Sequence, residues 1–341
     1  MINIDISFYP EENRIYVHTL LYLKGVVIKA LILENGIYKE VQRWGWDFAD
    51  GRYFFSHPSL KENTDFKVEI WDNFETTILK EATFKGSKTT SHDKILVISP
   101  IKNEIDILPF FLDYYLNFLK VDKIIFVDGG SDDGSVGLIN SYGNKTEVIN
   151  RDHGQYNEYL LMSERNTLWK SYKHDYDWII VCDADEFLYH PNFRELLKNY
   201  SNLGITIPNI RGYDMISQEF PIFQPSRYIT ELVTKGIRHE GLDKKIVFNP
   251  KKVNMAYSFG SHYCFPEGEV IYNTKSDIIL LHYKNLSYEY LLKKSRYGNN
   301  RRSEIAIAHK QANHWNENLK ITLEEYNKRF EQTFEVFPTT P

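Results

Sequence analysis

The first 88 residues alternate apolar and polar positions in short segments. These segments span residues 2–9, 14–23, 26–34, 52–57, 66–72 and 77–84. Turn-forming sequences such as "PEEN", "ENG" and "ADG" separate them at intervals of roughly ten residues. A period of two with frequent turns predicts a small antiparallel β-sandwich over residues 1–88. We find no candidate catalytic group there, and the roles open to such a domain are glycan binding, oligomerisation and bracing of its neighbour.

The pattern changes after a polar linker at residues 85–93. Continuous apolar runs then alternate with segments of helical spacing. We predict strands at residues 94–100, 121–130, 146–152 and 178–186, and helices at 104–120, 131–143 and 158–174. Strands that are apolar throughout and alternate with helices are typical of a parallel sheet covered on both faces. The predicted fold class is therefore α/β, with a Rossmann-like, mostly parallel sheet in a domain over residues 89–341.

A tail with helical spacing follows at residues 287–337, and we assign it, up to residue 341, to the second domain. Its basic stretch "KKSRYGNNRR", residues 293–302, has two interpretations. The first is a solvated helix face, which is the usual role of such a stretch. The second is a peripheral contact with an anionic membrane surface or with a lipid-pyrophosphate acceptor.

Polar side chains cluster where the predicted strands end. Asn103 and Glu104 follow the first strand, Asp128 ends the second, and Asp183 and Asp185 end the fourth. In sheets of this kind, ligands bind beyond the carboxyl ends of the strands. We therefore expect these side chains to converge on one edge of the sheet and to form the binding site there.

The acidic sequence "DADE" at the end of the fourth strand is the most informative of these. In an extended chain Asp183 and Asp185 point to the same side, while Ala184 points away. Two carboxylates suit Mg²⁺ or Mn²⁺, which takes one or two such ligands and completes its shell with substrate phosphates and water. An isolated D-x-D sequence is more often a solvated acidic turn. Its position at the end of a core strand favours the metal site.

Composition excludes some classes of protein. The chain has 341 residues, 42% hydrophobic and 26% charged, which is enough for two folded cores. A net charge of −5 argues against a nucleic-acid-binding protein, which would carry a basic excess. Cys182 lies in an apolar run and Cys264 among aromatic residues, so reduced thiols are expected rather than a disulfide. With no signal peptide or membrane span evident, we expect a cytoplasmic location, with any peripheral contact at the inner face of the cell membrane.

Four segments carry a family resemblance when they are taken together. They read "ILVISPIKNE", "IIFVDGGSDDGS", "SERNTLW" and "WIIVCDADEFL". Their order and spacing resemble those of the family-2-type glycosyltransferases with the GT-A fold, in particular the bacterial branch with the sequence D-x-D-E-F, over about residues 94–297. The resemblance implies a metal-dependent, inverting transfer of a sugar from a nucleotide diphosphate, a UDP-sugar being expected first, to a glycan or lipid-linked acceptor. The implied setting is bacterial surface polysaccharide or glycoconjugate synthesis. Apart from the resemblance, a homo-oligomer is left open.

The resemblance also implies which residues surround the nucleotide. The turn that contains Pro100, Asn103 and Glu104 would line the base pocket, and Asp128 would contact the base or the ribose. Gly129 stands where many relatives have an acidic residue, which leaves the choice of base open.

For the metal, the resemblance implies that Asp185 binds the ion directly and that Asp183 reaches the donor ribose or a metal-bound water. Relatives take a third ligand from a later strand, and His282 in "DIILLHYKN" ends such a strand. A core histidine capped by backbone is the alternative for His282. Arg165 and Asn166 match the "RN" of a helix that packs beneath the nucleotide.

Departure of a nucleoside diphosphate builds negative charge, which a cation and a nearby Lys or Arg stabilise. Lys244 and Lys245 in "GLDKKIVFNP" are the candidates for contact with the diphosphate, with Lys284 in reserve.

An inverting enzyme also needs a general base near the acceptor hydroxyl. Relatives place the acceptor in the part of the chain that holds residues 204–223 and 256–273. We favour Asp214 or Glu219 as the base, with His262 close behind; the other eligible groups, Glu240 and Asp243, lie between these two stretches.

Three other classes fit parts of the sequence. A nucleotidyltransferase also joins a parallel sheet to metal-binding carboxylates, but it would have a glycine-rich basic loop after the first strand, and "SPIKNEIDI" is not one. A haloacid-dehalogenase-type phosphatase carries its D-x-D on the first strand, whereas this chain has it on the fourth. A carbohydrate-binding protein with a degenerate transferase domain would not need both Asp183 and Asp185. The first and last of these stay open as alternatives to the transferase.

Overall fold

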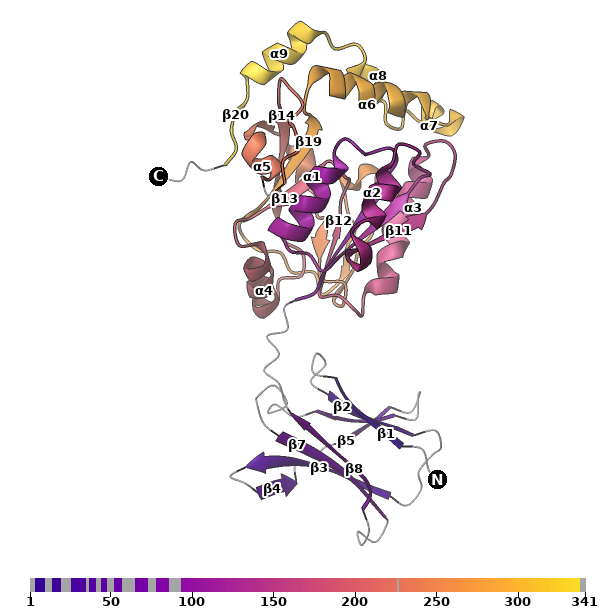
Figure 1. Ribbon diagram of the computed structural model, residues 1–341, viewed down its shortest axis with the longest axis vertical. Helices are drawn as coiled ribbons and strands as arrows, with labels where there is room; N and C mark the ends of the chain where they lie inside the picture. Colours follow the sequence, from indigo (N-terminus) through magenta and orange to yellow (C-terminus); the bar gives the residue numbers. More distant parts are fainter. Residues whose placement is uncertain are drawn as a thin grey trace. The chain divides into compact units, whose positions relative to one another are not determined.

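The computed structural model describes residues 4–9, 14–19, 26–34, 37–40, 44–47, 52–56, 65–72, 78–85, 93–225 and 227–337. The chain forms two compact units, Met1–His92 and Asp93–Pro341 (Figure 1). The expected combination of a small all-β unit and a larger α/β unit is confirmed.

The described residues of the first unit form two four-stranded antiparallel sheets. One has the order β1 (Ile4–Tyr9), β2 (Arg14–Thr19), β6 (Arg52–Ser56), β5 (Trp44–Asp47). The other has the order β4 (Ile37–Glu40), β3 (Val26–Glu34), β7 (Asp65–Asp72), β8 (Ile78–Lys85). Strands β4 and β5 are additional to the predicted segments. Each has four residues, which is too few for an alternating pattern to stand out.

The second unit is built on a five-stranded sheet with the order β11-β10-β9-β12-β16. Its strands are β9 (Ile95–Ile101), β10 (Lys123–Asp128), β11 (Thr146–Asn150), β12 (Trp178–Val181) and β16 (Val247–Phe248). Strands β9 to β12 are parallel, and β16 pairs with β12 in the antiparallel sense at the edge. The predicted mostly parallel sheet is therefore confirmed.

Side chains of β9 show why this sheet was predicted from apolar runs without alternation. Ile95 packs in one hydrophobic core with Phe111, whereas the next residue, Leu96, packs in a second core with Trp169. Both faces of the strand are buried, so every position is apolar. The covering helices are α1 (Leu108–Asp113), α2 (Ser135–Asn140) and α3 (Glu158–Thr167).

The first predicted helix, residues 104–120, is shorter than its pattern suggested. Pro109 lies in the first turn of α1, where its missing N–H does no harm. After Asp113 the chain continues as a π-helical turn, Tyr114–Phe118. Helical spacing of apolar residues therefore continues beyond the end of the regular α-helix.

A second five-stranded sheet has the order β13-β19-β14-β15-β20. Its strands are β13 (Glu186–Tyr189), β14 (Ile210–Ile216), β15 (Lys235–Arg238), β19 (Ile278–Asn285) and β20 (Phe334–Glu335). The predicted strand at residues 178–186 was too long. Strand β12 ends at Val181, and the chain turns before β13 begins in this other sheet. The acidic sequence therefore forms the turn that joins the two sheets.

Shorter elements complete this part of the chain. They are α4 (Phe193–Leu203), α5 (Ile229–Leu232), β17 (Val253–Asn254) and β18 (Glu267–Gly268).

The tail forms α6 (Tyr288–Asn300), α7 (Glu304–Ala308), α8 (His314–Asn318) and α9 (Leu323–Glu331). Three of these helices begin at hydroxyl caps, Ser287, Ser303 and Thr322, which satisfy N–H groups of the first turn. Gly298 of α6 lies against Trp315 of α8, where an added Cβ would come within 2.5 Å of the indole ring. The four helices gather at one end of the unit, with α4 at the other end (Figure 1).

Among the helices in the described part of the chain, none is long and apolar enough to cross a membrane.

Candidate active site

A cavity of about 450 Å³ lies where the strands of the parallel sheet end. Residues from the ends of β9 and β10, the loop after β11, the acidic turn, α3 and β19 line it, and the tail helices α6 and α8 add further side chains. This volume is typical of a small-molecule site. The expected position of the site, beyond the carboxyl ends of the strands, agrees with this cavity.

Most of the sequence-predicted residues line the cavity. They are Pro100, Glu104, Arg165, Asp183, Asp185, Asp214, Lys244, His262 and His282. Asn103, Asp128 and Glu219 are not among the lining residues.

Each of these three side chains has another place in the structure. The carboxylate of Asp128 is buried and accepts hydrogen bonds from the N–H of Gly130 at 3.1 Å and from the hydroxyl of Ser131 at 2.6 Å. It thereby shapes the loop after β10. Asn103 exchanges hydrogen bonds with Asp132 at 2.6 and 2.9 Å, and Glu219 is exposed.

The acidic turn is held by its own third carboxylate. Glu186 accepts a hydrogen bond from the backbone N–H of Asp183 at 3.1 Å and forms a buried ion pair with Lys244. Burial alone would lower the pKa of Lys244, but Glu186 and Asp183 raise it above its usual value. Lys244 therefore stays charged and is committed to Glu186, so the structure does not present it as a free cation for a diphosphate.

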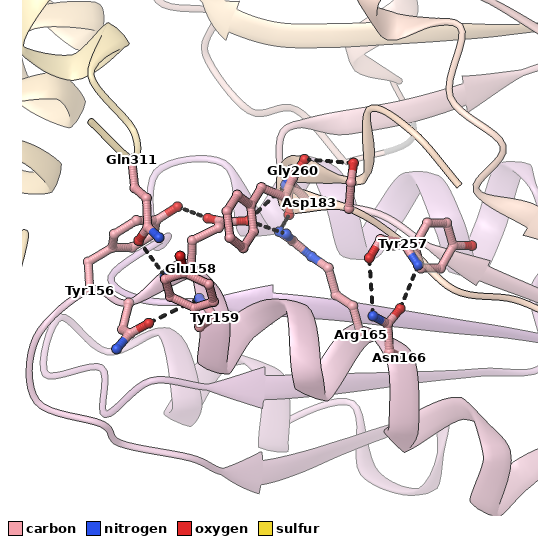
Figure 2. Close-up of polar contacts among 12 residues, drawn as sticks. Tyr156, Glu158, Tyr159, Arg165, Asn166, Asp183, Tyr257, Gly260 and Gln311 are labelled. Carbon is pink, nitrogen blue, oxygen red and sulfur yellow. Dashed lines mark hydrogen bonds and ion pairs between the residues drawn. The ribbon is translucent and has the colours of Figure 1, made fainter. Parts of the chain in front are cut away.

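Arg165 of α3 lies between two carboxylates (Figure 2). It donates to Asp183 at 2.7 Å and to Glu158 at 3.1 Å. Burial opposes its charge, yet these two partners raise the pKa of Arg165. Burial likewise opposes ionisation of Asp183, but Arg165 and Lys244 hold the pKa of Asp183 below its usual value. Asp183 is thus an ionised carboxylate, turned toward Arg165 while still lining the cavity.

Glu158 connects several segments that are distant in the sequence (Figure 2). Its carboxylate accepts hydrogen bonds from the hydroxyl of Tyr156 and from the N–H of Gly260, the latter at 2.8 Å. Its own N–H donates to Gln311 of the tail at 3.2 Å. The next helix position after Arg165, Asn166, exchanges hydrogen bonds with the backbone of Tyr257.

His282 is held between two carboxylates at the end of β19. Its Nδ1 donates to Asp214 at 2.9 Å, and its Nε2 lies 3.6 Å from Oδ2 of Asp185. The second oxygen of Asp214 accepts a hydrogen bond from Arg329 at 2.9 Å. Burial would lower the pKa of His282, but the two flanking carboxylates raise it to about 10. Burial also opposes ionisation of Asp185 and Asp214, but His282 holds the pKa of each well below its usual value.

This donor set fits a divalent cation with two protein ligands. A histidine whose far nitrogen donates to a carboxylate is the usual arrangement of a metal-binding imidazole, because that contact sets the tautomer and the ring orientation. Nε2 of His282 lies beside the carboxylate of Asp185, and a metal ion would take the place of the proton that Nε2 shares with this carboxylate. Within the residues that the structure describes, no group of three or more His, Cys, Asp or Glu side chains could hold a metal ion. Further ligands would therefore be substrate oxygens and water, as is common for Mg²⁺.

Two lysines reach the cavity from the C-terminal part of the chain. Lys284 follows His282 by two positions on β19, so both side chains point to the same side of the strand. In the described part of the chain, Lys284 has no hydrogen-bond or ion-pair partner, and burial lowers its pKa. Lys294 of α6 pairs with Glu104 inside the cavity.

The basic stretch 293–302 is therefore less cationic at its surface than its sequence suggests. Besides the pair of Lys294 with Glu104, Lys293 contacts Asp106 at 2.5 Å. The guanidinium of Arg301 lies over the ring of Tyr297, and Arg301 also lines the cavity. A membrane contact through this stretch stays a prediction.

The remaining candidate lysine and the two cysteines have the following positions. Lys245 donates to Asn209 at 2.6 Å and does not line the cavity. Cys182 is buried, Cys264 is half-buried, and both are free thiols, as predicted.

Sequence reasoning missed Glu158, Lys294 and His314 as residues of the site. Glu158 follows the N-cap of α3, where an acidic residue is common for reasons of helix stability alone. Lys294 and His314 lie in a tail whose spacing showed helices but not the surface they cover. Lys284 was placed in reserve, although its spacing from His282 could have ranked it first.

The larger unit is thus of the α/β class, with a mostly parallel sheet and an acidic turn after the fourth strand in chain order. Residues 96–262 match the family model described as "Glycosyl transferase family 2". The matched residues include the parallel sheet and the acidic turn.

Comparison with solved structures finds likenesses to S. aureus TarS. For one TarS structure the identity is 14% and the TM-score 0.34, over 68% of this chain and 46% of that chain. For TarS 1-349 in complex with UDP the identity is 13% and the TM-score 0.37, over 70% of this chain and 72% of that chain. For TarS 1-349 in complex with UDP-GlcNAc the identity is 12% and the TM-score 0.34, over 70% of this chain and 73% of that chain. The present chain thus spans less than half the length of the first of these. No curated protein sequence matches it.

Proposed function

We propose that this protein transfers a sugar from a nucleoside diphosphate donor to a hydroxyl group of a glycan or lipid-linked acceptor, with Mn²⁺ or Mg²⁺ as cofactor and inversion at the anomeric carbon. A UDP-sugar is the first donor to test. The proposed setting is the synthesis of bacterial surface polysaccharide or glycoconjugates on the cytoplasmic side of the membrane. The family match supports sugar transfer, and the charged residues that line the cavity support binding of a diphosphate.

The single observation that carries the proposal is the pairing of Asp185 with His282 beside Lys284. Two metal-ligand donors lie in one cavity with Lys284, which has no ion-pair partner among the residues that the structure describes. A diphosphate is a dianionic, oxygen-rich group that such a set would bind from two sides. Neither a solvated acidic turn nor a capped core histidine explains an unpaired lysine in the same cavity.

The chain's own residues account for binding and for charge in the transfer. Pro100 and Gly129 line the end of the cavity next to β9 and β10, where the base would lie. Asp183, fixed by Arg165, would orient the ribose. Lys284 would stabilise the negative charge that develops on the departing diphosphate. A divalent cation held by Asp185 and His282 would supply further positive charge at the diphosphate oxygens.

The test is hydrolysis of nucleotide sugars, with water in place of the unidentified acceptor. UDP-, GDP-, CMP- and dTDP-sugars are compared with and without Mn²⁺. We expect Mn²⁺-dependent release of one nucleoside diphosphate, and loss of that release in Asp185→Asn. Binding without hydrolysis would support a carbohydrate-nucleotide binding protein instead. Neither binding nor hydrolysis of any donor would contradict the proposal.

A further inference from the structure

We propose that His262 is the general base that takes the proton from the acceptor hydroxyl. This inference rests on the proposed function and names the group that its acceptor side requires. The imidazole of His262 lies in the turn after the short 3₁₀ segment Phe259–Ser261 and lines the same cavity as Asp185, His282 and Lys284.

The hydrogen bond of His262 decides which ring nitrogen is free. Nδ1 lies 2.9 Å from the carbonyl oxygen of Gly241. A carbonyl oxygen only accepts, so Nδ1 carries the hydrogen and donates it. In the neutral ring, Nε2 then has a lone pair and no hydrogen. Within the described residues nothing hydrogen-bonds to this Nε2, which leaves it available to a substrate hydroxyl.

The backbone that carries His262 is held in an unusual conformation. Gly260 has φ +62° and Ser261 has φ +56°, a region that residues other than glycine rarely adopt. The N–H of Gly260 donates to Glu158 at 2.8 Å, and Ser261 is buried (Figure 2). A Cβ on Gly260 would lie 2.8 Å from Cδ2 of His262, so only glycine allows the ring to lie against this turn. Such conformations persist where surrounding contacts enforce them, and they are frequent at functional sites.

The carboxylates that could serve as the base are otherwise engaged. Asp214 lines the cavity, but its two oxygens contact His282 and Arg329. Asp243 accepts hydrogen bonds from Gly212 and Arg238 and does not line the cavity.

Glu219 and Glu240 complete the set of eligible acids. Neither of them lines the cavity, whereas His262, which is exposed as they are, does. Of the five groups eligible by sequence, His262 alone combines a place in the cavity with an unoccupied basic atom.

His262 lines the same cavity as the proposed metal ligand His282, and His314 lines it too. Burial lowers the pKa of His314 to about 4, and the nearby Lys284, His282 and His262 lower it as well. His314 therefore has all three of these side chains within electrostatic range.

In the transfer step, the O–H bond of the acceptor breaks and its proton moves to Nε2 of His262. The oxygen forms a bond to the anomeric carbon of the donor. The bond from that carbon to the diphosphate oxygen breaks, and its electron pair leaves with the nucleoside diphosphate. The charge on the imidazolium offsets the charge on the departing group, so the step is balanced without any other reactant.

The test uses the hydrolysis assay with two variants of the full chain. In His262→Asn the amide retains a donor for Gly241 but lacks a basic nitrogen. We expect the kcat for hydrolysis to fall by about 10²- to 10⁴-fold, the range for loss of a general base. The Kd for the UDP-sugar should stay within about twofold, because the base acts on the acceptor. His174→Asn, at an exposed histidine outside the cavity lining, is the matched control and should keep wild-type activity.

In His262→Ala, added imidazole should restore part of the lost hydrolysis, because the free base can occupy the vacated space. Hydrolysis by either variant within about threefold of wild type would overturn the assignment. So would loss without any rescue by imidazole, which indicates a structural role, or a parallel loss of donor binding. If the wild-type protein neither binds nor hydrolyses a nucleotide sugar, the proposed function fails first, and that outcome is distinguishable from all of these.

Discussion

Nε2 of His282 lies 3.6 Å from Oδ2 of Asp185, although 96 positions separate the two residues in the sequence. The pairing of β13 with β19 produces this approach, because Glu186 stands opposite His282 in the antiparallel register. A turn that leads into β13 therefore brings Asp185 to the end of β19. Asp214 on the neighbouring β14 stands opposite His282 on its other side.

Lys284→Ala should weaken the enzyme without weakening the fold. Removal of the unpartnered ammonium should lower the kcat for donor hydrolysis by about 10²-fold, the usual effect of losing one charge-stabilising donor. Thermal unfolding should be unchanged or shifted upward, since a desolvated charge is removed. Lys245→Ala is the control, because Lys245 donates to Asn209 away from the cavity lining. Equal losses in the two variants would contradict the role of Lys284.

Lys244→Met, in contrast, should lower the stability of the fold. It leaves the carboxylate of Glu186 buried without its partner, and breaking a buried pair costs about 3–5 kcal/mol of the free energy of unfolding. Urea denaturation measures this loss. A change below about 1 kcal/mol, together with a large loss of donor affinity, would show that Lys244 acts as a free cation for the diphosphate after all.

Glu104 should make stability depend on pH. Burial raises the pKa of Glu104 from 4.5 to about 7, and Lys294 only partly offsets it. Between these pH values the folded state holds a proton that the unfolded state has lost, so the contribution of Glu104 to stability falls as the pH rises. Comparison of urea unfolding at pH 5 and pH 8 should show a smaller decrease for Glu104→Gln than for wild type. An equal decrease in both proteins would show that Glu104 titrates normally.

Glu158→Gln tests the network that joins α3, the turn at Gly260 and the tail. The amide still accepts from Gly260 but no longer carries the charge that faces Arg165. We expect a loss of about 1–3 kcal/mol in the free energy of unfolding, because buried Arg165 loses one of its two anionic partners and keeps only Asp183. If the free energy of unfolding of Glu158→Gln stays within about 0.5 kcal/mol of wild type, the network does not stabilise the fold.

The fold could be predicted where burial controls the sequence. Strand β9 is buried on both faces, so its apolar run identified it within one residue at each end. The turn at Asp183 and Asp185 was predicted as extended chain, because the hydrogen bond from the N–H of Asp183 to Glu186 that shapes it leaves no periodic pattern. Both carboxylates nevertheless line the cavity, since the turn lies at the sheet edge where ligands bind.

The candidate site was predictable only for residues at strand ends. His282 and Asp185 stand at such positions, and the acidic spacing pointed to them. Both oxygens of Asp214 are occupied, one by His282 and the other by Arg329. These contacts join β14, β19 and α9, and no local sequence pattern predicts them. The same is true of Lys294, which enters the cavity from a tail helix.

The central claim is that Asp185 and His282 hold the cation that binds the donor diphosphate. Titration of the 341-residue protein with UDP, with and without Mn²⁺, tests it most directly. We predict that Mn²⁺ tightens UDP binding to the wild-type protein by at least about tenfold, that is about 1.4 kcal/mol. Asp185→Asn should remove this difference while it retains the weaker, Mn²⁺-independent affinity. An equal Mn²⁺ effect in the two proteins would contradict the claim.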